Sequence, residues 1–275
     1  MTRDRKVVYY RDPLTDDFAG THIETGVIDE TYPYKHGWFW NACSAALYAF
    51  AVPIVWFLHR VIGGVRFVDR GKRKQVKGPC FLYGNHTAMF DAYTPALLSF
   101  SRRADVLAGA DAFSIRGIRT IVQMLGGLAI PNRRSGMKHF MDAVRYEYAR
   151  GRDIAIFPEA HIWPYYTGVR PFTATSFSYP VKLGAPVFAY FVAYSEPKGL
   201  EKLFRKARTR VYLSDPIYPD PKLSHKDAQK DLRDRVYAFM EETAKAHSTY
   251  AVIEYVRLFD DAADGAPQDA RRPAL

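Results

Sequence analysis

The chain has 275 residues, a formal net charge of +10 and only two cysteines. This length is sufficient for one large domain with a buried core. Cys43 and Cys80 lack the C-x-x-C spacing of a zinc or redox site and do not indicate a disulfide framework, so a reduced, cytoplasmic protein is expected. The positive charge favours an anionic partner, which could be nucleic acid, the cytoplasmic face of a membrane or a phosphorylated substrate.

The first 36 residues are polar and rich in turn-forming residues. Their opening stretch, MTRDRKVVYYRDPLTDD, lacks the apolar core of a secretory signal, so we do not expect export. No hydrophobic period continues through residues 1–36. We therefore expect an irregular arm, which together with the apolar segment that follows forms an N-terminal unit over residues 1–64.

An uncharged apolar run follows at residues 37–58, GWFWNACSAALYAFAVPIVWFL. About 20 apolar residues are enough to span a bilayer. The run begins with Trp38 and Trp40, whose rings favour the headgroup interface, and it contains Pro53. We expect residues 37–62 to be a membrane-associated helical segment that either spans the bilayer or lies in one leaflet. A buried core helix is the alternative.

Strand-like and helix-like patterns alternate through the rest of the chain. Strand-like segments occur at residues 65–69, 80–85, 106–110, 127–131, 153–160, 185–194 and 210–219. Helical spacing occurs at residues 88–100, 115–125 and 135–151, and again from residue 224. Ser135 is expected to cap the third of these helices, and Ser224 with Asp227 forms a capping box for the last one.

This alternation predicts one α/β domain over residues 65–258, with a mainly parallel or mixed sheet flanked by helices. Residues 259–275 are low in bulky apolar side chains and are expected to be disordered. In such a sheet, ligands bind outside the carboxyl ends of the strands. His86, Arg133 and Glu159 each follow a predicted strand, so we expect these three side chains at one edge of the sheet.

His86 and Asp91 lie five positions apart in the stretch YGNHTAMFDAY. On a continuous helix they would point about 140° away from each other. If His86 instead precedes the helix, its ring can fold back toward Asp91, which would fix the tautomer and stabilise the imidazolium. The pair would then act as a general base on a substrate hydroxyl. Alternatively, Asp91 simply complements the helix dipole.

Four short motifs together carry a resemblance to a known family. N-H-x-x-x-x-D is matched by Asn85, His86 and Asp91, and F-P-E by residues 157–159. A block close to G-x-x-F-I-D-R is matched in register by residues 127–133, and an apolar run around V-P by residues 185–187. In order and spacing, residues 65–215 resemble glycerolipid acyltransferases of the lysophosphatidic acid acyltransferase type.

The resemblance implies transfer of an acyl group from a thioester to a hydroxyl of a membrane-embedded lipid acceptor. The donor would be acyl-CoA or acyl carrier protein, with no further cofactor and no metal. His86 would deprotonate the hydroxyl, Asp91 would orient His86, and Asn85, Arg133 and Glu159 would bind the polar head of the acceptor. The protein would work at the cytoplasmic face of the cell membrane, against its anionic surface, as a monotopic protein or with one transmembrane segment.

The chain departs from the family pattern after Glu159. Ala160, His161 and Ile162 stand where the family has Gly-Thr-Arg, so an arginine expected to bind phosphate is missing. Arg134 or Arg170 could replace it, or the acceptor could be a glycolipid or another lipid alcohol. Alternatively, Arg170 forms a surface ion pair. The aromatic residues 163, 165 and 166 could line an acceptor or acyl-chain surface or could pack in the core.

Two other classes of function remain open. A metal-dependent hydrolase could use His86, Asp91, Glu159 and His161 as ligands, although the sequence contains no H-E-x-x-H motif. A basic binding module for membrane or nucleic acid could use the patches at residues 71–77 and 198–210. No nucleic-acid fold signature accompanies these patches, so we do not expect nucleic acid as a partner.

Overall fold

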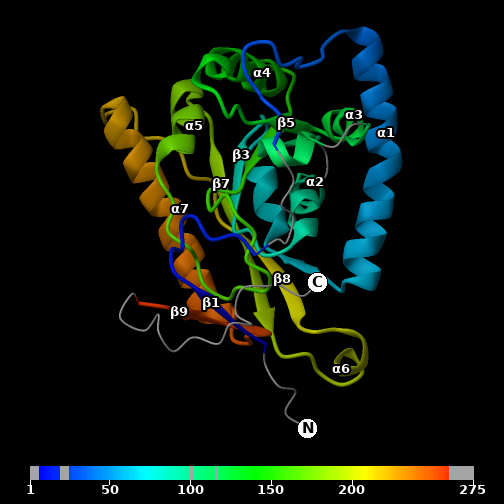
Figure 1. Cartoon of the computed structure of the whole chain (residues 1–275), viewed down its shortest axis with the longest axis vertical. Coiled ribbons are helices and arrows are strands. Elements are labelled where there is room, and N and C mark those ends of the chain that lie inside the picture. The colour runs from blue at the N-terminus through cyan, green and yellow to red at the C-terminus, as the bar shows by residue number, and fades with distance from the viewer. Residues whose placement is uncertain (1–5, 19–24, 100–101, 115–116, 260–275) are drawn as a thin grey trace.

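The structure is a computed structural model that describes residues 6–18, 25–99, 102–114 and 117–259 (Figure 1). Its centre is a seven-stranded sheet with the order β2-β8-β7-β3-β6-β4-β5. Every neighbouring pair is parallel except β7 and β8, which confirms the predicted mixed sheet. The strands are β2 Arg66–Val68, β3 Phe81–Gly84, β4 Ala104–Ala108, β5 Gly127–Ala129, β6 Asp153–Ile156, β7 Val187–Ser195 and β8 Arg208–Leu213.

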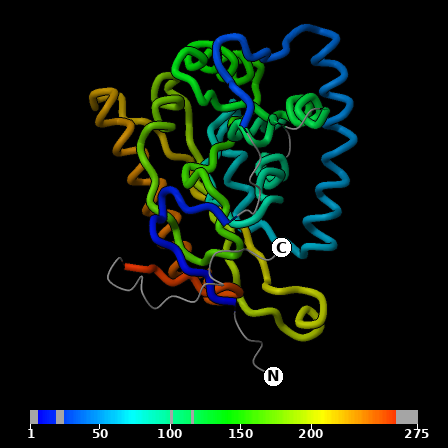
Figure 2. The backbone as a smooth tube through the Cα atoms, in the orientation of Figure 1, coloured from blue at the N-terminus to red at the C-terminus, as the bar shows by residue number. Residues whose placement is uncertain are grey.

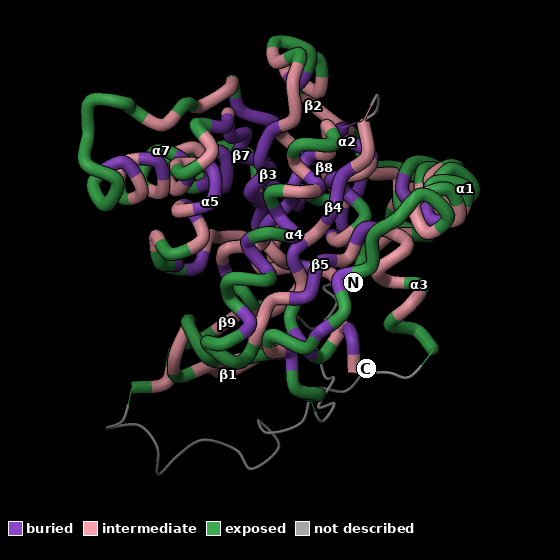
Figure 3. The backbone as a smooth tube through the Cα atoms, turned by 90° about the horizontal axis from the view of Figure 1, so that it is seen from above, coloured by how far each residue is buried: buried purple, intermediate pink, exposed green. Residues whose placement is uncertain are grey.

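Helices cover both faces of this sheet. Because successive side chains of a strand point to opposite faces, Phe81 and Tyr83 enter one apolar core while Leu82 enters the other. The helices α5 and α7 lie on one side of the sheet, and α2 lies on the other with α1 outside it (Figures 1 and 3). The helices are α1 Trp38–Phe57, α2 Thr94–Leu98, α3 Ile118–Met124, α4 Met137–Ala149, α5 Ser178–Leu183, α6 Glu201–Phe204 and α7 His225–His247.

One of the two predicted helix caps is confirmed. The Ser224 hydroxyl accepts a hydrogen bond from the Asp227 backbone N–H, and α7 begins at the next residue. Ser135 does not cap α4, because a short 3-10 turn, Arg134–Gly136, precedes that helix and moves its start to Met137. The helix predicted at residues 88–100 is a 3-10 turn, Met89–Tyr93, followed by α2.

The N-terminal arm is more ordered than the sequence indicates. Residues Lys6–Tyr10 form strand β1, which pairs in parallel with strand β9, Ile253–Arg257. Figure 2 shows the two strands side by side near opposite ends of the chain. The arm then enters the main core, where Ile28 is buried and the Tyr34 hydroxyl donates to the Ala129 carbonyl at 2.6 Å. The expectation of an irregular arm is therefore wrong for residues 6–10, whereas the other described residues of the arm, 11–18 and 25–36, form no helix or strand.

The apolar segment is a helix on the outside of the molecule. Helix α1 continues through a π-helical turn, Leu58–Ile62, and these 25 residues are long and apolar enough to cross a membrane. Ser44 is the single buried residue of α1, and Figure 3 shows the rest of the helix at the surface. The alternative of a buried core helix is therefore wrong. The tail from residue 260, which we expected to be disordered, lies outside the described residues.

Candidate active site

The site begins at the carboxyl end of β3, where the chain leaves the buried sheet. Asn85 is fully buried and pairs with the backbone of Val192 on β7, accepting from its N–H at 2.7 Å and donating to its carbonyl at 3.1 Å. Gly84 lies so close to the Tyr190 ring that a Cβ atom there would overlap it. These contacts hold the end of β3 against β7 and determine where the next residue, His86, emerges.

Three backbone contacts hold His86 and Thr87 in an extended loop. The His86 N–H donates to Glu159 Oε2 at 3.2 Å, while its carbonyl accepts from the Trp163 N–H at 3.1 Å. The Thr87 carbonyl accepts from the Tyr165 N–H at 3.0 Å. The loop after β6 therefore fixes the backbone of His86 through hydrogen bonds. His86 itself lies before the 3-10 turn that begins at Met89.

Asp91 lies beneath this loop with its carboxylate already oriented. Its Oδ2 atom accepts the backbone N–H groups of Thr87 at 2.6 Å and Ala88 at 2.7 Å. His86 Nδ1 lies 3.6 Å from the same oxygen, and the imidazole stacks on Phe157 with ring centroids 4.2 Å apart. The predicted folding back of His86 toward Asp91 is thus present, at a separation longer than a hydrogen bond.

This geometry gives the two nitrogens of His86 different surroundings. Nδ1 is buried, faces Asp91 and has no hydrogen-bond partner among the described residues, so it can donate to the carboxylate once the pair closes. Nε2, on the opposite side of the ring, is then the nitrogen left to accept a proton. Because the His86 side chain is only 14% exposed, an imidazolium formed here would depend on Asp91 for stabilisation.

Glu159 is a buried anchor that joins the two loops of the site. Besides the hydrogen bond from the His86 N–H, the Glu159 carboxylate accepts two hydrogen bonds from Arg170. One comes from the backbone N–H at 3.0 Å and the other from Nη2 at 3.2 Å. Burial raises the pKa of Glu159, and the Arg170 guanidinium opposes this shift. Arg170 is fully buried, lies over the Trp163 ring and also donates to the His161 carbonyl. It thus forms a buried ion pair and not a surface one.

The family comparison identifies the part of the chain that contains this geometry. Residues 65–192 match the family model described as Acyltransferase. The matched region contains His86, Asp91 and Glu159. No curated protein sequence matches the chain significantly. Among solved structures, the chain is similar to the 1-acyl-sn-glycerophosphate (LPA) acyltransferase PlsC from Thermotoga maritima, with 18% identity and a TM-score of 0.49. The match covers 77% of this chain and 96% of that one.

The structure does not bring Arg133 or Arg134 into contact with the His86 pair. Both side chains are exposed beyond β5, and Asp29 of the N-terminal arm is the charged group near Arg133. In the sheet order, β5 lies three strands from β3, a lateral distance of about 14 Å at the usual spacing between strands. The assignment of Arg133 and Arg134 to binding of the acceptor therefore remains a prediction.

Asn85 and Arg170, which were also predicted to bind the acceptor, are both fully buried, and their side chains contact protein groups.

Several residues of the candidate site were not predicted. Thr87 is buried and contacts both Asp91 Oδ2 and the Tyr194 hydroxyl, at 3.3 and 2.8 Å. Its position inside the N-H-x-x-x-x-D motif is the one sequence signal that pointed to it. Phe157 belonged to a recognised motif, but its stacking on His86 depends on how β6 lies beside β3.

The aromatic stretch after Glu159 packs mainly in the core, with Trp163 buried and Tyr165 and Tyr166 half-buried. Trp163 is fully buried, donates from its indole to the Asp16 carbonyl at 2.7 Å and packs against Tyr10, Phe18 and Tyr255. The expectation that Trp163 lines an acceptor or acyl-chain surface is therefore wrong, because the N-terminal arm covers its ring.

Ala160 stands where the family has glycine, and its backbone is in the left-handed conformation with φ of 64°. This conformation costs an L-residue roughly 1–2 kcal/mol of free energy.

The four residues considered as metal ligands do not gather into one site. His161 lies 3.5 Å from Asp17 of the arm, whereas Asp91 is held by the loop after β3. Within the described residues, no cluster of three histidine, cysteine, aspartate or glutamate side chains is placed to hold a metal ion. The described geometry instead places the His86 ring beside the Asp91 carboxylate, which two backbone N–H groups hold in place.

Proposed function

We propose that the protein transfers a fatty acyl group from a thioester donor, acyl-CoA or acyl carrier protein, to a hydroxyl of a lyso-glycerophospholipid such as lysophosphatidic acid. The observation that carries this proposal is the His86–Asp91 pair within a domain of the acyltransferase family. A base without a covalent acyl-enzyme is suited to activating the acceptor's own hydroxyl.

In the proposed reaction, His86 Nε2 takes the proton of the acceptor hydroxyl as its oxygen attacks the thioester carbonyl. The new C–O ester bond forms, the C–S bond breaks, and the leaving thiolate takes the proton back from the imidazolium. Asp91 accepts from Nδ1 throughout and stabilises the positive charge of His86. Two backbone N–H groups already orient that carboxylate, so little rearrangement is needed before the proton moves.

The acceptor is proposed to carry a phosphate, and a glycolipid is the alternative. The test is mass spectrometry of the lipids formed when the purified protein in detergent receives mixed phosphorylated and neutral lyso-lipids with acyl-CoA. We expect acylated phospholipid as the main product. Arg133→Lys should raise the KM for the phosphorylated acceptor, because lysine cannot reproduce the forked, two-bond contact of a guanidinium with phosphate. Lys138→Arg, at another exposed cation in the same region, is the matched control.

Two results would contradict the phosphate assignment. One is equal turnover of phosphorylated and neutral lyso-lipids, with Arg133→Lys neutral for both. The other is exclusive acylation of a neutral glycolipid. Either result would leave acyl transfer as the reaction, since the His86–Asp91 pair does not depend on the acceptor head group.

We also propose that α1 attaches the protein to the cytoplasmic face of the membrane, where the positive charge of the protein meets anionic lipid. Phe50 on α1 is 70% exposed, and burying such a side chain in lipid contributes about 1.5–3 kcal/mol. Phe50→Gln should therefore weaken partition into lipid vesicles by about tenfold or more. Phe259→Gln, at a side chain 66% exposed and outside α1, should leave partition unchanged.

Flotation with vesicles measures this partition. High salt should not release the wild-type protein, because salt screens charges and leaves apolar burial intact. Complete release by salt, or equal effects of the two phenylalanine variants, would show that α1 is not inserted. Deleting residues 1–62 is a less clean test, because it also removes β1 and the buried Tyr34.

A further inference from the structure

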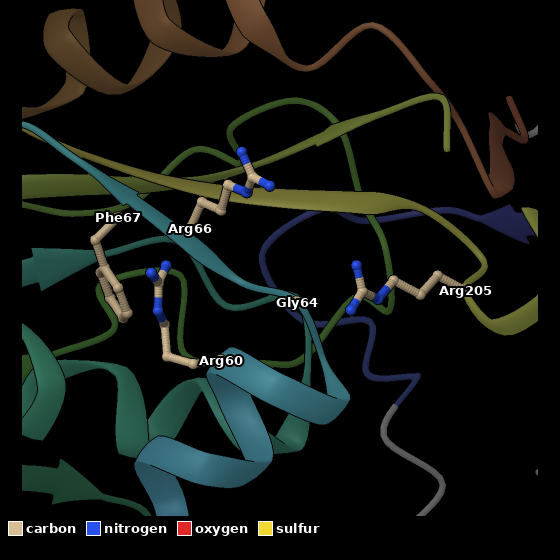
Figure 4. Close-up of a pocket in the computed structure, with 5 residues that line it drawn as sticks. All are labelled: Arg60, Gly64, Arg66, Phe67 and Arg205. Atoms are coloured by element: carbon tan, nitrogen blue, oxygen red, sulfur yellow. The ribbon is translucent and has the colours of Figure 1, made fainter. Parts of the chain in front are cut away.

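A pocket lined by arginines lies where α1 meets the sheet. It has a volume of about 380 Å³ and is lined by Arg60, Gly64, Arg66, Phe67 and Arg205, none of which is acidic (Figure 4). The three arginines come from three separate segments: the π-helical end of α1, the start of β2 and the loop between α6 and β8. The Arg205 guanidinium packs directly on Gly64, where a Cβ atom would overlap it.

The pocket has excess positive charge that the protein does not neutralise. The Arg66 side chain makes no hydrogen bond or ion pair within the described part of the chain. Arg60 donates to the Val65 carbonyl at 2.9 Å, which positions it without neutralising its charge. The nearby carboxylate of Glu201 lies 3.4 Å from Arg205, but it is shared with Arg208 at 2.9 Å. An anionic ligand is therefore the group that would complete this pocket.

Sheet topology places this pocket at the same edge as His86. Strand β2 runs parallel to β8, β8 runs antiparallel to β7, and β7 runs parallel to β3. The beginnings of β2 and β8 therefore lie at the edge where β3 ends. The turn that carries Arg60 also carries His59, which is buried and lies near Phe90 and Asp91 of the loop after β3. The pocket and the catalytic loop thus share a structural support.

Exposed apolar side chains flank the pocket. Val61 and Ile62 lie in the π-helical turn after α1, and Leu200, Leu203 and Phe204 lie just before or within α6, all of them more than half exposed. A hydrogen bond from Arg205 Nη2 to the Val61 carbonyl at 3.3 Å joins the two segments. Large apolar groups gathered around a cationic pocket fit a ligand with a phosphate head and acyl chains.

We propose that this pocket binds the phosphate group of a glycerophospholipid at the membrane surface. Guanidinium groups match phosphate oxygens through paired charge-assisted hydrogen bonds, and the flanking apolar side chains would contact the acyl chains. This binding rests on the proposed membrane attachment and does not depend on acyl transfer. It supplies a phosphate site separate from Arg133, in a protein whose family motif lacks its usual arginine after Glu159.

Binding of soluble short-chain lipids to the full chain in neutral detergent tests the proposal. The probes are short-chain phosphatidic acid, the matching diacylglycerol without phosphate, and coenzyme A. Arg66→Gln should weaken phosphatidic acid binding by about tenfold, the usual effect of losing a hydrogen bond to a charged group, and leave diacylglycerol binding unchanged. Arg60→Gln with Arg66→Gln should weaken it further. Lys226→Gln with Lys230→Gln, exposed on α7, is the charge-matched control.

The outcomes separate this site from the catalytic one. The His86→Ala variant should bind phosphatidic acid as tightly as the wild type does. Binding at the arginine pocket can therefore be detected even if the protein does not transfer acyl groups. Unchanged phosphatidic acid binding in Arg66→Gln would overturn the proposal, as would an equal loss in the lysine control or a loss confined to coenzyme A. Because the Arg66 side chain has no partner among the described residues, its replacement should not unfold the domain, and a thermal melt checks this.

Discussion

Replacing His86 with alanine should lower the rate of acyl transfer by about 100 to 10,000-fold while the protein stays folded. In the proposed mechanism the imidazole takes the acceptor's proton, because its Nδ1 atom faces Asp91 and its Nε2 atom remains for substrate. Removing the ring leaves the anchoring of the loop in place, since Glu159, Trp163 and Tyr165 bind backbone atoms. The measurement is kcat for release of the free thiol from acyl-CoA in the presence of a lyso-lipid.

The matched control for this variant is His225→Ala, which removes an exposed imidazole at the start of α7. It should retain wild-type activity. Circular dichroism and gel filtration in detergent check that both variants are folded. A folded His86→Ala variant with a rate close to that of the wild type would remove His86 from the mechanism and would make Asp91 a purely structural carboxylate.

Replacing Glu159 with glutamine should lower the free energy of unfolding by about 3–5 kcal/mol, because it leaves the buried Arg170 charge without its anionic partner. Glutamine keeps the volume and one carbonyl acceptor, so the loss comes mainly from charge. The penalty should be large because Arg170 Nε and Nη1 are also buried and have no hydrogen-bond partner within the described residues. Equilibrium urea unfolding in neutral detergent measures this loss.

The control for this prediction is Glu196→Gln. Glu196 pairs with Lys202 at 3.2 Å, but both side chains are about 60% exposed, so breaking the pair should change the free energy by less than about 1 kcal/mol. Equal stability losses in the two variants would mean that the Glu159–Arg170 pair is not a buried anchor. Glu159→Gln should also lower activity, because the same carboxylate holds the His86 backbone.

Local sequence patterns were sufficient to predict those features that depend on neighbouring residues, namely strands, helix caps and the apolar helix. The strand before His86 and the strand before Glu159 both read as short buried segments, and the rule for parallel sheets placed their ends at one edge. The hydrogen bond between the His86 N–H and Glu159 confirms that placement, because β3 and β6 are direct neighbours. The Ser224 cap and the apolar α1 helix could also be predicted, because a helix cap and a run of apolar residues each involve only neighbouring positions in the sequence.

Tertiary structure alone decided which distant segments meet. The sequence assigns Arg133 to the correct edge but does not specify the lateral order of strands, which places β5 three positions from β3. The pairing of β1 with β9 and the gathering of Arg60, Arg66 and Arg205 likewise join segments far apart in the chain. Burial of Arg170 depends on Glu159 and Trp163 closing around it. Such contacts are selected by the packing of the whole core, so no pattern within one segment records them.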